Sequence, residues 1–292
     1  MMAHMSDIYD SVIPRVPPRP EEARLPSLWR GMGDMFLRTV AVGLAVILLF
    51  VFVVVVADVS QKQSCNVAVY SVHGEIATYG AGPFDTDSGY LTREIERVDD
   101  DTNIKALILD VDSPGGSPVA GEEIANALNR MSKPSIAVIR GMGASAAYWA
   151  ATGADTIYAS RSSDVGSIGV AVSFPDESEK NKKDGVAYNE FASGKFKNLG
   201  TPTRPVTKEE QSLLERDIDL VFTHFVEMVA SARHMEVSAV RALADGSTMT
   251  GARALDAGLV DVIGGIEEAR VAIEKEIGVS AVLCEPDSVP LF

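Results

Sequence analysis

The 292-residue sequence is poor in the residues from which metal and redox sites are built. Its two cysteines, Cys65 and Cys284, lack CxxC spacing and are too few for a disulfide framework. Its four histidines are scattered and show neither paired nor HExxH spacing. We therefore expect no metal and no other cofactor, and the sequence leaves open whether the two cysteines pair.

Basic residues are also in deficit, with 26 Lys and Arg against 41 Asp and Glu, a formal net charge of −15. A nucleic-acid partner is excluded as the main ligand, because binding to phosphates relies on clustered Lys and Arg. The hydrophobic content of 46% is too high for a largely disordered chain. A chain of this length has room for one large domain or two small ones.

Residues 39–57, TVAVGLAVILLFVFVVVVA, carry no charge. As a helix rising about 1.5 Å per residue, this run reaches roughly 28 Å, close to the thickness of a bilayer core. A buried core helix would show a polar face, which this run lacks. A cleaved signal peptide would have a shorter apolar stretch and small residues at its end, which Val55-Val56-Ala57 fits poorly. We therefore predict one retained transmembrane helix, with the lipid bilayer as a partner.

The charges on either side of this run predict its orientation. Arg24, Arg30 and Arg38 precede it, whereas only Lys62 follows it before residue 80. Positive flanks stay in the cytoplasm, so the N-terminus should be cytoplasmic and the domain after the span should lie outside, on a single-pass protein of the cell membrane. We expect a disordered cytoplasmic tail at residues 1–38, the transmembrane helix at 39–57, a linker at 58–66, a folded domain at 67–277 and a C-terminal tail at 278–292.

After the linker, strand patterns alternate with helix patterns. Apolar runs predict strands at Val67–Val72, Ala106–Val111, Ser135–Ile139 and Thr156–Ala159. Residues Ala120–Met131 place apolar side chains on one helical face, and Thr207 with Glu210 forms the capping box of a long helix. The alternation predicts an α/β fold with a mostly parallel sheet.

Two glycines follow the second predicted strand, in the segment Asp112–Ser117 (DSPGGS). Adjacent glycines at the end of a strand let the backbone turn sharply and expose N–H groups, which can stabilise an oxyanion. An ordinary strand-to-helix turn would have the same composition, so this segment is not decisive alone.

A serine lies among small residues in Gly141–Ala150 (GMGASAAYWA), where the third predicted strand meets a helix. Small neighbours allow a substrate backbone to approach Ser145, and a helix N-terminus adds N–H groups near a developing anion. The alternative is a serine in a tightly packed helix start.

A serine nucleophile needs a base. No histidine is placed by a motif, although His73, His224 and His234 remain candidates. A lysine can serve where burial keeps its amine uncharged. Lys197, in the segment Ser193–Asn198 (SGKFKN), has Phe196 and Leu199 beside it, but it can equally be a surface lysine, as can Lys195.

The order of DSPGG, GASAAYWAA and SGKFKNLGTP followed by TKEE resembles the signal peptide peptidase A family of S49 serine peptidases. Val165–Gly169 (VGSIG) makes the resemblance more specific, and it spans roughly Val67–Ile277. It implies a Clp protease/crotonase-like fold for a short, single-domain member. The chain departs from the family at Ala146-Ala147, where Gly-Gly usually follows the nucleophile, which leaves the depth of the specificity pocket in doubt.

The resemblance also implies roles for individual residues. Ser145 matches the nucleophile, Lys197 the general base and Ser167 a serine that positions the lysine. The oxyanion region is matched by Gly115, Gly116 and the Ala146 N–H.

The implied activity is that of a membrane-anchored serine endopeptidase that hydrolyses remnant signal peptides and other membrane-associated peptides. In this family a neighbouring subunit can supply the base, so we expect a homo-oligomer. Three alternatives remain: an inactive membrane-tethered binding protein of the same fold, a Ser–His hydrolase, and a crotonase-type acyl-CoA enzyme.

Overall fold

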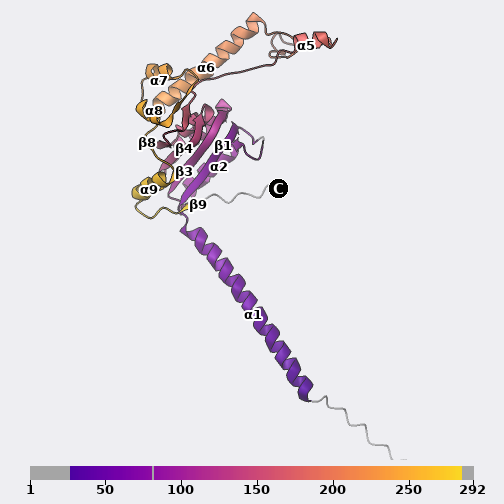
Figure 1. Cartoon of the computed structure of the whole chain (residues 1–292), viewed down its shortest axis with the longest axis vertical. Helices are drawn as coiled ribbons and strands as arrows, with labels where there is room; N and C mark the ends of the chain where they lie inside the picture. Colours follow the sequence, from indigo (N-terminus) through magenta and orange to yellow (C-terminus); the bar gives the residue numbers. More distant parts are fainter. Residues whose placement is uncertain (1–26, 81, 285–292) are drawn as a thin grey trace, which may run out of the picture. The chain divides into compact units, whose positions relative to one another are not determined.

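The computed structural model describes residues 27–80 and 82–284 of the chain (Figure 1). The chain divides into two compact units, residues 1–60 and 61–292. Most of the tail predicted at residues 1–38, and the end of the tail predicted at 278–292, lie outside the described residues.

The first unit contains most of α1, Ser27–Ser64, a helix long and apolar enough to cross a membrane over Leu37–Val54. The helix begins before the predicted span and continues through most of the predicted linker. Residues 27–64 contain no proline, so no backbone break stops the helix where the apolar run ends.

The second unit is built on a mostly parallel sheet, as predicted. Along the sheet the order is β2-β1-β3-β4-β5-β8, and these neighbours are all parallel. The strands are β1 (Val67–Ala77), β2 (Thr86–Asp87), β3 (Ala106–Gly116), β4 (Ser135–Ala144), β5 (Thr156–Ala159) and β8 (Val262–Ile263). Off this path, β6 (Asp164–Gly166) pairs with β4, β7 (Thr248–Thr250) pairs antiparallel with β6, and β9 (Leu283–Cys284) pairs with β1.

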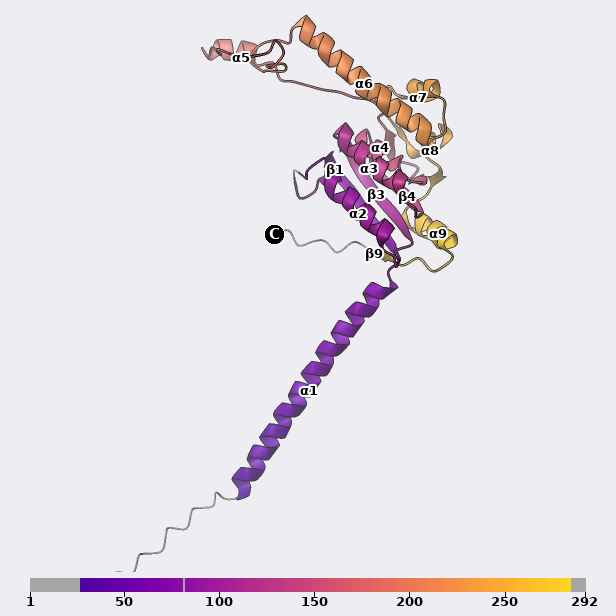
Figure 2. The same cartoon turned by 180° about the vertical axis from the view of Figure 1, so that it is seen from behind.

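Helices cover both faces of the sheet. Leu107, Leu109 and Val111 of β3 face a core shared with α2 (Ser88–Asp100), α3 (Pro118–Arg130) and α4 (Ala146–Ala151). Ala106 and Ile108 face a second core with α9 (Ile266–Ile277). Burial on both faces explains why this strand reads as a continuous apolar run. Figure 2 shows α2 and α3 lying along the strands.

The long helix α6, Lys208–Ala232, begins at the predicted capping box. The Thr207 hydroxyl accepts the Glu210 N–H, and the Glu210 carboxylate accepts the Thr207 N–H. Arg204 donates two hydrogen bonds to the same carboxylate, at 2.7 and 2.8 Å, which lowers the pKa of Glu210 to about 2. This set of contacts fixes the point at which the helix starts.

The two halves of α6 differ in their surroundings. Its C-terminal half buries Phe225, Val226 and Val229 in the core, beside α7 (Val237–Leu243). Its N-terminal half is more exposed. Residues 171–206, which we name the arm, run out from the body of the domain and include α5 (Ser178–Lys183), which lies beyond that end of α6 in both views (Figures 1 and 2).

A disulfide bond joins Cys65 to Cys284, with their Cα atoms 5.6 Å apart. The pairing that the sequence left open is therefore present. Cys284 belongs to β9, where it lies opposite Ala68 of β1, and Cys65 lies two residues before β1 begins. The bond thus connects the start of the domain to its last described strand, across a sequence separation of 219 residues.

We expect loss of this disulfide to lower the free energy of unfolding by about 2–5 kcal/mol, because the cross-link restricts the unfolded chain. Urea unfolding of the full chain in detergent, followed by circular dichroism, measures the effect. The double variant C65S/C284S should match the reduced wild-type protein. Equal stability of the oxidised and reduced wild-type protein would contradict the prediction.

Candidate active site

Ser145 lies where β4 ends and α4 begins, in a strained backbone conformation. Its φ of 53° is left-handed, which is uncommon outside glycine and recurs at functional sites. The Ser145 N–H donates to the Gly166 carbonyl at 2.8 Å, and its own carbonyl accepts the Trp149 N–H at 3.0 Å. Both backbone groups are thereby held, and the side chain makes no capping hydrogen bond.

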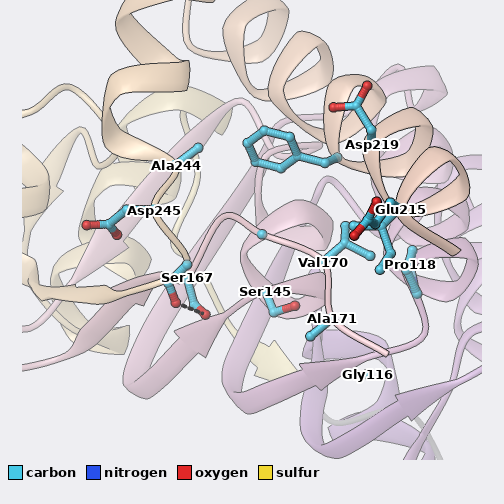
Figure 3. A pocket seen from close by; sticks show the side chains of 14 residues that line it. Gly116, Pro118, Ser145, Ser167, Val170, Ala171, Glu215, Asp219, Ala244 and Asp245 are labelled. Carbon is cyan, nitrogen blue, oxygen red and sulfur yellow. Dashed lines mark hydrogen bonds between the residues drawn. The ribbon is translucent and has the colours of Figure 1, made fainter. Parts of the chain in front are cut away.

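Ser145 opens into a pocket of about 610 Å³, drawn in Figure 3. The pocket is bounded by the end of β3, the turn between β4 and α4, the segment after β6, and α6. Its walls combine polar residues with apolar ones, and the apolar ones include Pro118, Val170, Ala171, Ile218, Phe222 and Ala244.

Two backbone N–H groups are available beside Ser145. Ala146 is the first residue of α4, so its N–H has no partner within the helix. The Ser117 N–H donates to the Ile76 carbonyl of β1 at 2.7 Å. Because alternate residues of a parallel strand bond to a given neighbour, the Gly116 N–H points away from β1, and Gly116 lines the pocket.

Gly115 contributes to this region by its lack of a side chain. Its N–H donates to the Ser113 hydroxyl at 3.0 Å, so it is already engaged. Its φ is +102°, and a Cβ built on it would lie 2.8 Å from the Ser145 Cβ and 2.9 Å from the Ala146 nitrogen. Only glycine allows β3 to approach the start of α4 this closely.

Ser167 lines the same pocket and also has a positive φ, 49°. Its hydroxyl donates to the Gly246 carbonyl at 2.9 Å, and its N–H donates to the Ser247 carbonyl at 3.0 Å. Because the hydroxyl proton is used, the oxygen lone pairs are left to accept a hydrogen bond from a cation. The structure thus brings Ser145 and Ser167 together.

Lys197 is not among the residues that line this pocket. It lies exposed in the arm, near Lys195, which forms an ion pair with Glu209 at 2.7 Å. Glu209 is in the first turn of α6, about 9 Å along the helix from Glu215, the first residue of α6 that lines the pocket. Within one chain, therefore, the structure does not bring Lys197 to Ser145.

No histidine lines the pocket either, among the residues that the structure describes. His224 lies 3.2 Å from a Glu122 carboxylate oxygen, and its ring meets Trp149 edge-on at 5.4 Å. His73 belongs to β1, and His234 follows α6. The arrangement gives no support to a Ser–His hydrolase. The described residues also contain no group of three or more His, Cys, Asp or Glu side chains suited to a metal ion.

Acidic residues at the pocket were not anticipated from the sequence. Glu215 and Asp219 on α6 line it, together with Asp245, whose pKa is lowered by hydrogen bonds from the Ser247 hydroxyl and N–H. In the sequence, the acids of α6 look like an ordinary solvated helix face. Ser113 was not singled out from the sequence either, since nothing in DSPGG alone shows what its hydroxyl contacts.

Comparison with known proteins shows matches among peptidases. Residues 127–280 match the model of Peptidase family S49. A "Putative protease MJ0651" of Methanocaldococcus jannaschii is 35% identical over 66% of this chain and 63% of that protein. A "Putative signal peptide peptidase SppA" of Enterococcus faecium is 32% identical over 70% and 62%, and "Protease 4" of Haemophilus influenzae is 32% identical over 70% and 34%. The chain thus aligns with less than two thirds of the length of these relatives.

Among solved structures, a point mutant of the "1510-N membrane-bound stomatin-specific protease" matches 77% of this chain and 99% of its own, with a TM-score of 0.50 and 15% identity. That likeness supports the Clp protease-like α/β fold alone. The family model, however, covers more than half of the sequence, and the chain therefore belongs to peptidase family S49.

Proposed function

We propose that the chain is a membrane-anchored serine endopeptidase in which Ser145 is the nucleophile and Lys197 of a second copy is the general base. One observation carries this proposal. The pocket holds two serine hydroxyls and is flanked by two N–H donors, yet neither lysine nor histidine is among the described residues that line it. We infer that the base enters from outside the pocket.

The reaction would be acyl transfer. The uncharged Lys197 amine takes the Ser145 proton as the hydroxyl oxygen attacks a peptide carbonyl carbon. The resulting oxyanion accepts hydrogen bonds from the Gly116 and Ala146 N–H groups, each worth about 3–4 kcal/mol in the transition state. The lysine ammonium then protonates the leaving amine, and water hydrolyses the acyl-enzyme. Ser167, as a positioning residue, would accept a hydrogen bond from the lysine.

The surface of the arm supports a homo-oligomer. Phe191 is 95% exposed, and Val186 and Tyr188 also face solvent in a single chain. Apolar side chains gathered on one segment favour burial against a partner. A second copy that covers the arm would at the same time place its own arm against a neighbouring pocket.

The disulfide supports the predicted topology. Disulfides persist in oxidising compartments and are rare in the cytosol, so Cys65–Cys284 favours a domain outside the cytoplasm. The apolar helix α1 would then anchor it to the cell membrane, with its arginine-rich end inside. By analogy with the relative named as a signal peptide peptidase, we propose remnant signal peptides and other membrane-associated peptides as substrates.

Co-expression of two inactive variants tests the shared site. S145A lacks the nucleophile and K197A lacks the base, so each should be inactive alone. In oligomers that mix both at random, about one quarter of the sites would combine an intact Ser145 with an intact Lys197 of the neighbour. We therefore expect the purified mixture to hydrolyse a fluorogenic peptide at about one quarter of the wild-type rate. A mixture as inactive as its components would place the base in the same chain.

A further inference from the structure

Ser113 carries a buried hydroxyl that the proposed reaction does not use. It lies in β3, within the DSPGG segment, and is 1% exposed. Its hydroxyl donates to the Gly74 carbonyl at 2.6 Å and accepts the Gly115 N–H at 3.0 Å. One side chain thus connects the backbone of β1 to the glycine pair beside Ser145.

Strand β1 is shaped to meet this hydroxyl. The register between β1 and β3 shifts between His73 and Glu75, so Gly74 lies at an irregularity in the ladder. Its φ is +60°, and a Cβ built there would lie 2.2 Å from the Phe84 carbonyl oxygen, so the position admits only glycine. The irregularity turns the Gly74 carbonyl toward the side chain of Ser113.

The glycine pair has little conformational preference of its own. Gly115 has a φ of +102° and Gly116 a φ of +154°, which L-residues rarely adopt. Hydrogen bonds with residues outside the glycine pair must therefore hold its backbone in this conformation. The Gly115 N–H is held by Ser113 and the Ser117 N–H by Ile76, one on each side of the Gly116 N–H that faces the pocket.

We infer that Ser113 is a positioning residue for the oxyanion site: its hydroxyl orients Gly115 so that the Gly116 N–H points at the carbonyl oxygen under attack. The inference rests on the proposed function. An oxyanion donor acts on the transition state and contributes little to the binding of the ground-state substrate. Loss of the Ser113 hydroxyl should therefore change kcat and leave KM nearly unchanged.

The test compares S113A and S113C with S135A in the full-length protein in detergent. Ser135 is a matched control, because it is similarly buried, hydrogen-bonds Asp155 at 2.9 Å and begins the neighbouring strand β4, far along the strand from Ser145. We expect S113A to lower kcat by about 10- to 100-fold with KM within about twofold of wild type. S113C, which keeps a weak donor and acceptor, should fall in between.

A peptide boronate, which forms a tetrahedral adduct with a serine nucleophile, gives a second readout. S113A should weaken its inhibition by about the same factor as kcat, whereas S135A should change neither. Unchanged kcat and boronate inhibition in folded S113A or S113C would overturn the role of Ser113. Absence of any Ser145-dependent hydrolysis by the wild-type protein would instead overturn the proposed function itself.

Discussion

Substitution S145A should lower kcat for peptide hydrolysis by about 10⁶-fold, the scale at which serine peptidases lose activity without their nucleophile. The remaining N–H donors can still polarise a carbonyl, but no acyl-enzyme can form. The measurement is the hydrolysis rate of a fluorogenic peptide by the full-length chain in detergent, at saturating substrate. Binding of the peptide should persist, because the pocket walls are unchanged.

The control for this substitution is S135A, at the beginning of the same strand that ends beside Ser145. It removes a buried hydroxyl from a region remote from the pocket and should leave kcat within about twofold of wild type. If S145A hydrolyses peptides as fast as S135A, the chain is not a peptidase of the proposed kind. A membrane-tethered binding protein with the same fold would then be the better interpretation.

Substitution K197A should lower kcat by about 10⁴-fold, the upper range for loss of a general base. K197R should be equally inactive, because a guanidinium stays protonated and cannot accept the Ser145 proton. Rescue by arginine would mean that Lys197 contributes only its charge. The same fluorogenic assay measures both variants, and gel filtration checks that the oligomer is intact.

Two control substitutions test whether the loss of hydrolysis is specific to Lys197. K195A removes the neighbouring lysine of the arm, whose exposed ion pair with Glu209 contributes little to stability. H224Q removes the histidine on α6 nearest in sequence to the pocket residue Phe222. Both should retain activity within a few-fold of wild type. Loss of hydrolysis in H224Q, with K197A active, would overturn the Ser–Lys pair in favour of a Ser–His hydrolase.

Local sequence patterns were sufficient to predict much of the fold. The run ALILDV predicted the first six residues of β3, because a parallel strand buried on both faces needs apolar side chains at nearly every position, but the strand continues through DSPGG to Gly116. Thr207 and Glu210 predicted the start of α6 because a capping box uses groups only three residues apart. Helix α1 extends beyond both ends of the span predicted at residues 39–57, because charge and hydropathy report on the membrane span and not on where the backbone stops being helical.

By itself, the sequence determined the α/β class, the apolar helix and the small-residue setting of Ser145, since each depends on neighbours within a few positions. Only the tertiary structure decided that Cys65 pairs with Cys284, that the Ser113 hydroxyl bonds to the Gly74 carbonyl of β1, and that Lys197 lies outside the pocket of its own chain. These facts depend on contacts between residues far apart along the chain, or on their absence. Their geometry follows from how strands and helices pack, and no local periodicity encodes it.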